Sequence, residues 1–285
     1  MRRLIASAPA AAWPPPCPLA DATLAAAVQA HSMPIIRDYC FAQRDEGELV
    51  RNWTEAYVDG FCADYFSGRN PGTYGIEVGG RVRNALRLLP LSMAGSTGMV
   101  LGSEYPWVEC MALEEGAAAV WTFEYATIRS SHPKLFAKPT KVMAAEHISG
   151  ELPLVDWIAT WSSLEHSGLG RYGDALNPEG DREAVEEAWC MLKPGGYLIF
   201  AVPMTCAAAG SIEFNAHRIY GWERLAHVLQ GFELLGYSEQ CNFIPAGGTD
   251  TVILRKGAAL QGEGAPKLSS DDFAKAVVVS RTSGL

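Results

Sequence analysis

The chain has 285 residues, of which 48% are hydrophobic and 19% charged, and its formal net charge is −9. This composition excludes disorder of the whole chain, because enough apolar residues are present to form a substantial core. It also argues against nucleic-acid binding as the main function, since that affinity depends on clustered lysine and arginine. The best apolar run, residues 197–210, contains Pro203 and is shorter than the roughly 20 residues of a membrane-spanning helix.

Both ends of the chain differ from its middle. Residues 1–33 are rich in Ala and Pro and are expected to be a disordered segment or a processed leader, with a weak signal for targeting. Residues 34–95 predict a helical preface that packs on the core, with a glycine-rich loop at 67–80 and a helix over 81–89. Residues 96–256 form the main domain, and residues 257–285 are expected to be a mostly flexible tail with one short apolar run at 276–279.

Short apolar runs alternate with helical stretches through the main domain. Strands are predicted at 99–102, 119–125, 141–147, 154–161, 197–202, 232–237 and 251–255, and helices at 107–115, 181–192 and 222–230. This alternation predicts an α/β fold with a doubly wound, mostly parallel sheet. Ligands of such sheets bind at the carboxyl ends of the strands.

The cysteines give no sign of a disulfide framework. Seven of them lie at positions 17, 40, 62, 110, 190, 206 and 241. The odd number and the lack of a CxxC pair argue against disulfides and against a zinc knuckle. We therefore expect mostly buried thiols in the cytoplasm or another reducing compartment. Asn52-Trp53-Thr54 is a formal glycosylation sequon, although such triplets are common by chance.

Several strings in the main domain point to a family. A predicted helix ends in Leu-Lys-Pro-Gly-Gly at 192–196 and runs into an apolar strand, an arrangement that resembles class I S-adenosylmethionine-dependent methyltransferases. The strings SSLEHSGLGRYGDALNPEGD at 162–181, FNAHRIYG at 214–221, GSEYPWVE at 102–109 and YGIE at 74–77 resemble an uncharacterised methyltransferase-like family, domain of unknown function number 268. The resemblance covers roughly residues 50–256.

The resemblance implies a sheet of seven strands, with an antiparallel strand in the last pair, and S-adenosylmethionine as the cofactor. It names no methyl acceptor, although bacterial relatives look associated with surface-glycan synthesis. In the superfamily the first strand ends in a glycine-rich turn. Here that turn has a single glycine, Gly102, followed by Ser103 and Glu104 and then by the bulkier Tyr105 and Pro106.

Two further acidic positions are candidates for cofactor contacts. Glu124 ends the second predicted strand, where a carboxylate in a dinucleotide-type fold accepts hydrogen bonds from ribose hydroxyls. Glu146 or His147, after the third predicted strand, is expected to contact the adenine.

The candidate reaction site follows the fourth strand. An imidazole at His166 is placed to take a proton from a substrate hydroxyl or amine. Glu165 is expected to orient His166 or to contact the substrate, and His217 is expected at the same edge of the sheet. Expected substrate contacts are Arg171, Tyr172, Asp174, Asn177, Asn215 and Arg218, with Arg171 as a clamp for a carboxylate or phosphate. For Asp181 we prefer a helix-capping role.

These features predict a methyltransferase that acts on an oxygen or nitrogen of a small-molecule or glycan-like acceptor. Two alternatives stay open. The altered turn at 102–107 favours a non-catalytic binding or scaffold protein that kept the fold. A metal-dependent enzyme using His166 and His217 is less favoured, because tight ligand spacing such as HExxH is missing.

Overall fold

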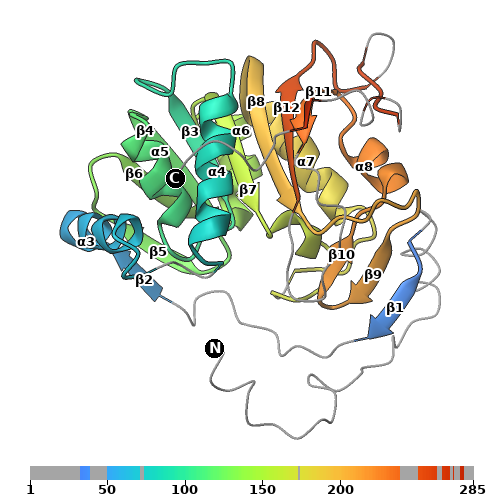
Figure 1. Ribbon diagram of the computed structural model, residues 1–285, viewed down its shortest axis with the longest axis horizontal. Helices are drawn as coiled ribbons and strands as arrows, with labels where there is room; N and C mark the ends of the chain where they lie inside the picture. Colours follow the sequence, from blue (N-terminus) through green and yellow to red (C-terminus); the bar gives the residue numbers. More distant parts are fainter. Residues whose placement is uncertain are drawn as a thin grey trace, which may run out of the picture.

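A long sheet forms the centre of the molecule in the computed structural model, which describes residues 33–38, 50–70, 74–172, 174–237, 250–261, 265–269, 272 and 277–278. The strand order is β13-β11-β12-β8-β7-β3-β4-β6 (Figure 1). The strands are β3 (Thr97–Leu101), β4 (Ala119–Glu124), β6 (Leu135–Pro139), β7 (Val155–Trp161), β8 (Leu192–Val202), β11 (Phe232–Tyr237), β12 (Asp250–Lys256) and β13 (Val277–Val278).

Most of this sheet is parallel. The pairs β3–β4, β3–β7, β4–β6 and β7–β8 are parallel, whereas β12 runs antiparallel to both β8 and β11. The expected mostly parallel sheet of seven strands with an antiparallel strand in the last pair is therefore confirmed. The two residues of β13 extend its edge beside β11, so part of the apolar run assigned to the tail belongs to the sheet.

Helices cover both faces of the sheet. They are α3 (Glu55–Phe66), α4 (Ile76–Leu88), α5 (Trp107–Glu114), α6 (Met143–Ser149), α7 (Gly180–Met191) and α8 (Trp222–Val228). Val100 and Ile199 point into a core shared with α3, α4 and α5, whereas Met99 and Leu198 point into a second core shared with α7 and α8. Because successive strand residues face opposite sides, burial on both faces explains the continuous apolar runs of β7 and β8.

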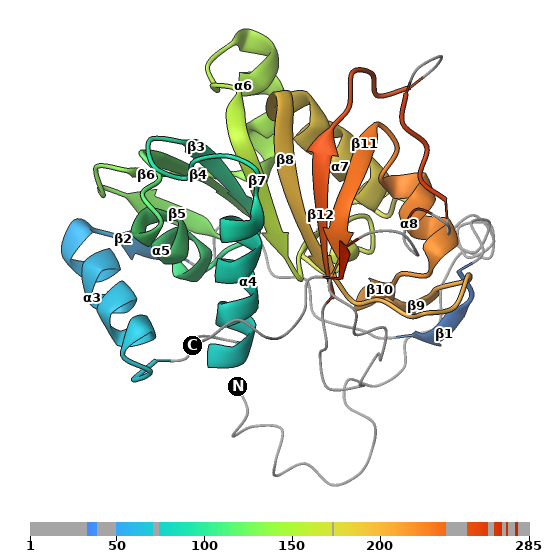
Figure 2. The same cartoon turned by 45° about the horizontal axis from the view of Figure 1, so that its top comes forward.

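Two small sheets flank the main sheet on opposite sides (Figures 1 and 2). One contains β1 (Ile35–Asp38), β9 (Ser211–Phe214) and β10 (His217–Ile219), and the other contains β2 (Val50–Trp53) and β5 (Thr127–Ser130). Strands β1 and β2 come from the segment expected to be a helical preface, and they pair with β9 and β5. This segment is thus joined to the main domain by strand pairing as well as by its helices.

The strand predicted at 141–147 is wrong. Residues Thr140–Val142 form a short 3₁₀ turn and α6 follows it, while the strand lies earlier, at β6. Ala144 and Ala145 are strong helix formers, which explains why this stretch becomes a helix. The prolines at 133 and 139 interrupt the apolar pattern that would have indicated β6.

The prediction that the cysteines stay reduced is also wrong. Cys62 of α3 and Cys110 of α5 form a disulfide that links residues 48 positions apart, and Cys206 is disulfide-bonded as well. Among the described cysteines, Cys190 is free and exposed. Because structural disulfides persist in oxidising compartments, this finding counts against the reducing compartment that the sequence favoured.

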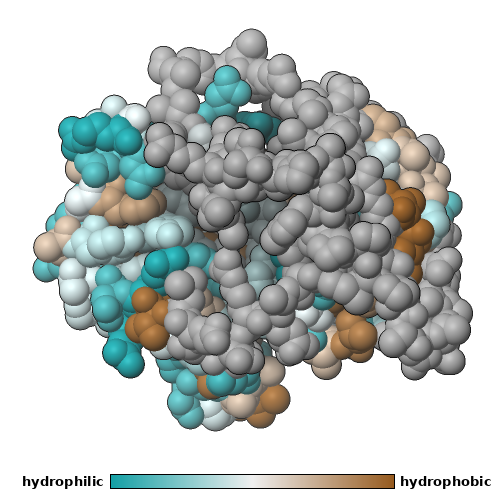
Figure 3. Space-filling model, turned by 90° about the horizontal axis from the view of Figure 1, so that it is seen from below, coloured by the Kyte–Doolittle hydropathy of each residue, from teal (hydrophilic) through white to brown (hydrophobic). Residues whose placement is uncertain are grey.

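No helix in the described ranges is long and apolar enough to cross a bilayer. On the face seen from below in Figure 3, small hydrophobic patches are interspersed with hydrophilic ones over the described residues.

Candidate functional site

The candidate site lies where neighbouring parallel strands end. The strands β4, β3, β7 and β8 lie side by side in that order, so the segments that follow them meet at the carboxyl edge of the sheet. Gly102 follows β3, Glu124 is the last residue of β4, and Ser162 follows β7. The structure thus brings three of the predicted site segments to one edge.

At Gly102, the turn after β3 packs closely against the loop after β7. Its φ of +81° is a conformation that favours glycine, and a Cβ atom built there would lie 1.9 Å from Ser163 Oγ. No other residue fits at this position without displacing the loop. The single glycine of the altered turn is therefore required by packing between two segments of the site.

The side chains of the turn are engaged within the protein. Ser103 Oγ lies 2.7 Å from the carbonyl oxygen of Tyr105 and 3.1 Å from Glu109 Oε2. Arg51 Nη2 donates a hydrogen bond to Tyr105 Oη at 2.9 Å and pairs with Glu104 Oε2 at 3.3 Å. Both predicted cofactor side chains, Ser103 and Glu104, thus contact protein groups.

Glu109 is a buried acid of this site that the sequence did not reveal. It lies in α5 with no exposed surface, and its Oε1 accepts a hydrogen bond from Thr122 Oγ1 at 2.7 Å. Burial raises the pKa of Glu109 to about 7. Its position in an apolar helix gave no motif, because its partners Ser103 and Thr122 come from other segments.

Glu124 is held at the tip of β4 by backbone groups. Its Oε1 accepts hydrogen bonds from the N–H groups of Tyr125 at 2.9 Å and Ala126 at 3.4 Å. Among the described residues no lysine or arginine forms an ion pair with it. Burial therefore raises the pKa of Glu124 to about 7, and the nearby Glu104 adds to this effect.

Glu146 lies in α6 rather than after a strand, and its carboxylate is paired. Lys138 Nζ of β6 donates to Glu146 Oε2 at 2.5 Å. No contact among the described residues joins Glu146 to the turn after β3 or to Glu124. This placement gives no support to the adenine contact expected from the sequence.

Glu165 combines full burial with an incomplete set of partners. It lies in the short turn η2 (Leu164–His166), and its Oε1 accepts a hydrogen bond from Ser162 Oγ at 2.6 Å. Its Oε2 has no hydrogen-bond partner in the described part of the chain. Burial raises the pKa of Glu165 to about 7. Ser162 has a φ of +48°, and such strain in a non-glycine residue is typical of functional sites.

His166 is held in one orientation by the backbone of another segment. Its Nδ1 lies 2.5 Å from the carbonyl oxygen of Ala216, and its Nε2 lies 3.5 Å from Glu165 Oε1. Burial and the nearby Arg171 lower the pKa of His166 well below its usual value. A neutral ring that donates Nδ1–H to Ala216 leaves the lone pair on Nε2. The ring therefore has one nitrogen fixed and one able to accept a proton.

His217 lies next to His166, as the sequence predicted. The two ring centres are 6.2 Å apart, and burial, with a contribution from Arg171, lowers the pKa of His217 to about 4. The described residues contain no group of three or more His, Cys, Asp or Glu residues that could hold a metal ion. The metal-dependent alternative finds no support in these ranges.

The loop after η2 reaches back to the tip of β4. Tyr172 stacks on Tyr125, which directly follows Glu124, with ring centres 5.7 Å apart and 18° between the planes. Its ring also meets His166 edge-on at 5.5 Å. Arg171 Nη1 donates to the Ala216 carbonyl at 3.0 Å. Tyr172 thus contacts both the segment that follows Glu124 and the ring of His166.

Asp174 shapes this loop through backbone contacts. Its carboxylate accepts hydrogen bonds from the N–H groups of Gly168 at 2.7 Å, Gly170 at 3.3 Å and Tyr172 at 3.2 Å. Asn215, with a φ of +57°, donates from Nδ2 to the Leu169 carbonyl at 3.3 Å. Both predicted substrate contacts therefore also stabilise the loop.

Asn177 and Arg218 form hydrogen bonds with the backbone of neighbouring segments. Asn177 Oδ1 accepts from the Glu179 N–H at 3.0 Å, which matches the turn that Asn-Pro often starts. Arg218 is 1% exposed and donates to the Ser167 carbonyl at 2.5 Å. The sequence predicted that Arg218 contacts the substrate. Its contacts with backbone carbonyls favour a different role, which is to hold the loop in place.

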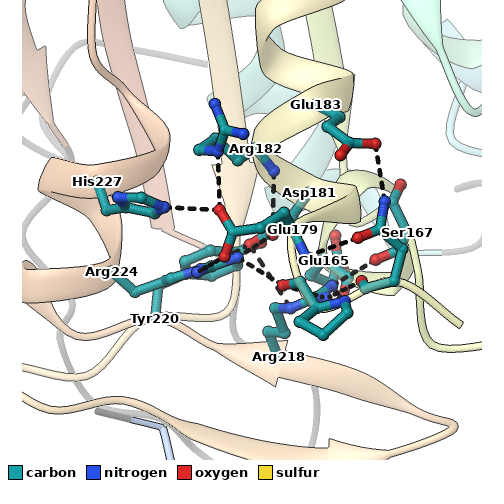
Figure 4. A network of polar contacts seen from close by, with 12 residues as sticks. Glu165, Ser167, Glu179, Asp181, Arg182, Glu183, Arg218, Tyr220, Arg224 and His227 are labelled. Atoms are coloured by element: carbon teal, nitrogen blue, oxygen red, sulfur yellow. Dashed lines mark hydrogen bonds and ion pairs between the residues drawn. The ribbon is translucent and has the colours of Figure 1, made fainter. Parts of the chain in front are cut away.

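Arg218 also belongs to a buried network around Asp181 (Figure 4). Asp181, at the start of α7, accepts a hydrogen bond from Tyr220 Oη at 2.9 Å and pairs with Arg224 of α8. Burial alone would raise the pKa of Asp181, but Arg218 and Arg224 lower it below its usual value. The Arg182 N–H donates to Asp181 Oδ1 at 3.0 Å within the first turn of α7, and Arg218 connects this network to the Ser167 carbonyl of the loop.

Comparison with protein families decides the membership of the chain. The family model described as "Caenorhabditis protein of unknown function, DUF268" matches residues 95–244, more than half of the chain. The chain belongs to this family. The match covers β3 to β11 and every segment of the candidate site described above. No curated protein matches the chain.

Solved structures resemble the DUF268 chain at low identity. The 1,6-didemethyltoxoflavin N1-methyltransferase of Burkholderia thailandensis is 15% identical, with a TM-score of 0.44 over 70% of this chain and 86% of that one. The N-methyltransferase NodS of Bradyrhizobium japonicum is 16% identical, with a TM-score of 0.39 over 62% and 86%. The cyclase SpnF is 14% identical, with a TM-score of 0.44 over 74% and 98%. Because their named reactions differ, this likeness does not assign a reaction.

Proposed function

We propose that this DUF268 protein is an S-adenosylmethionine-dependent methyltransferase that acts on an oxygen or nitrogen of a small-molecule or glycan-like acceptor. The observation that carries the proposal is the position of Glu124. It is a carboxylate at the tip of β4, beside the Gly102 turn of the neighbouring parallel strand, without an ion-pair partner among the described residues. Ribose hydroxyls would add hydrogen-bond donors to the backbone N–H groups of Tyr125 and Ala126 that this carboxylate already accepts from.

Some of the predicted residues have groups available to bind S-adenosylmethionine, and others do not. Glu124 and the backbone of the Gly102 turn are the groups proposed to hold it. Ser103 and Glu104 are assigned no direct contact, because their side chains are engaged by Glu109 and Arg51. Tyr125, on which Tyr172 stacks, offers an aromatic ring beside the same strand end. Side-chain contacts to the cofactor thus centre on the strand β4.

S-adenosylmethionine supplies an electrophilic methyl group, which an oxygen or nitrogen of the acceptor takes up. His166 Nε2 is proposed to receive the proton that the acceptor loses. For an oxygen acceptor, the hydroxyl becomes strongly acidic as its oxygen is methylated, so even the weak base expected of a buried imidazole suffices. Glu165 Oε2 is proposed to accept a hydrogen bond from the acceptor, since an unpaired buried oxygen is costly and a donor would satisfy it.

If the chain is a non-catalytic scaffold protein, it is expected not to bind S-adenosylmethionine. Full-length protein is titrated with S-adenosylmethionine in a calorimeter, alongside Glu124→Gln and the control Glu114→Gln, which alters an acid at the end of α5. We expect binding by the wild type and the control, and at least about tenfold weaker binding by Glu124→Gln, because a hydrogen bond to a charged group contributes about 1.5–3 kcal/mol.

Two results would contradict the proposal. Wild-type protein that is folded by circular dichroism and still does not bind would support the scaffold reading. Unchanged affinity in Glu124→Gln would remove this residue from the cofactor site.

A further inference from the structure

The proposed reaction leaves one sequence motif unused. Asn52-Trp53-Thr54 is the single N-x-S/T triplet of the chain, and it spans the end of β2 and the residue before α3. We propose that Asn52 carries an N-linked oligosaccharide and that the chain folds in an oxidising compartment. This inference is independent of the proposed methyl transfer.

The pairing of β2 directs Asn52 to the outside. Side chains alternate along a strand, and in β2 Trp53 is fully buried while Arg51 reaches inward to Tyr105. Val50 and Asn52 occupy the opposite face, where both are exposed. The acceptor amide is therefore accessible in the folded protein, and an oligosaccharide attached there points away from the core and from the Tyr105 side of the strand.

Thr54 of the triplet also lies at the surface. It is exposed, and its Oγ1 accepts a hydrogen bond from the Tyr57 N–H at 3.2 Å as the cap of α3. This contact uses an acceptor lone pair and leaves the hydroxyl proton available. The triplet is thus compatible with a glycan at its first residue and a helix cap at its third.

The disulfides supply the second, independent observation. The helix that Thr54 caps contains Cys62, which is bonded to Cys110, and Cys206 is disulfide-bonded as well. Disulfides of this kind persist in secreted proteins and in the lumen of the endoplasmic reticulum. Asn-x-Ser/Thr triplets are glycosylated on such proteins. The same compartment therefore accounts for both features.

The donor in this transfer is a lipid-linked oligosaccharide diphosphate. A bond forms between Asn52 Nδ2 and the anomeric carbon of the oligosaccharide, and the bond from that carbon to the diphosphate breaks. The lipid diphosphate leaves with the bonding electrons, and the amide nitrogen loses one proton to a base of the transferase. No oxidant or reductant is required.

The test uses the full chain, tagged at its C-terminus and directed to the secretory pathway of cultured animal cells. We expect a gel shift on digestion with peptide N-glycosidase for the wild type and for Thr54→Ser. Asn52→Gln should show no shift and still fold, because it keeps the cap of α3. Thr54→Ala loses both the triplet and the cap.

Peptide mapping of the same secreted protein without reduction is expected to recover Cys62 linked to Cys110. A wild-type chain that shows no shift, a shift that persists in Asn52→Gln, or free thiols at both cysteines would overturn the proposal. None of these readouts involves S-adenosylmethionine, so failure here is distinct from failure of the proposed function.

Discussion

At the scale of single residues, the proposed chemistry depends on the state of His166. The carbonyl of Ala216 fixes Nδ1, and burial with Arg171 holds the pKa well below its usual value. A ring in this state is neutral at pH 7 and keeps a lone pair on Nε2. It is thereby ready to accept a proton without first losing one.

The protonation state of His166 is testable without an acceptor. In nitrogen-15 spectra of the imidazole rings, we expect His166 to stay neutral, with its proton on Nδ1, between about pH 6 and pH 8, while an ordinary histidine titrates near pH 6.5. The assignment comes from the signals missing in His166→Gln. A normal titration, or a proton on Nε2, would contradict the proposed role.

Several site residues could be predicted because they follow strands. Glu124, Glu165 and His166 were recognisable from the apolar runs before them, and the structure places all three at the carboxyl edge of the sheet. Glu109 and the positive φ of Ser162 were not predictable. Both depend on partners from distant segments, which a sequence pattern does not record.

At the scale of elements, a buried network at the start of α7 connects the loop after η2 to α8. Asp181 contacts Tyr220 and Arg224, while Arg218 lies 3.6 Å from Asp181 and holds the Ser167 carbonyl of the loop. A buried pair of this kind is costly to break, since the remaining charge stays uncompensated. The network therefore fixes the position of the loop relative to the sheet.

We expect Asp181→Asn to lower the free energy of unfolding by about 3–5 kcal/mol, because the buried charges of Arg218 and Arg224 then lose the carboxylate between them and Arg224 keeps only Glu179 as an ion-pair partner among the described residues. The folded pKa of Asp181 is lowered, so its stabilisation is complete above about pH 4 and is lost as the pH falls. Urea denaturation at several pH values measures both effects. The control is Glu187→Gln, an exposed acid on the same helix; an equal loss in both variants would show that the Asp181 network is not the cause.

Sequence patterns predicted some elements closely and others poorly. The longest described strand, β8, and the longest described helix, α4, each begin five residues before the expected start. The strands β7 and β11 and the helices α5 and α7 lie within one or two residues of the expected ranges. Short strands such as β9 and β10 were missed, because three or four residues carry little periodicity. The stretch that became α6 lacked the alternation of a strand, and its alanines favoured a helix.

At the scale of the whole molecule, the disulfide joins the segment before the sheet to α5, the helix that follows the Gly102 turn. Cys62 and Cys110 pack together because α3 lies against α5. The two cysteines are 48 residues apart. Their pairing could not be predicted from the sequence, because spacing alone does not show which residues are in contact in the fold. The expected fold class was predictable, whereas this covalent link was not.

We expect Cys62→Ser to lower the free energy of unfolding by about 2–5 kcal/mol, because the unfolded chain is then less constrained. Chemical denaturation under non-reducing conditions measures the loss, and Cys190→Ser, at a free exposed thiol, is the matched control. Equal stability of Cys62→Ser and the wild type would show that the bond does not form in solution.

The proposed function requires that this DUF268 protein bind S-adenosylmethionine across the ends of β3 and β4. A crystal structure of the full chain with S-adenosylhomocysteine tests it most directly. We expect ribose hydroxyls within hydrogen-bond distance of the Glu124 carboxylate and the sulfur on the side of His166. Crystals grown at saturating ligand that hold it elsewhere, or not at all, would contradict the account.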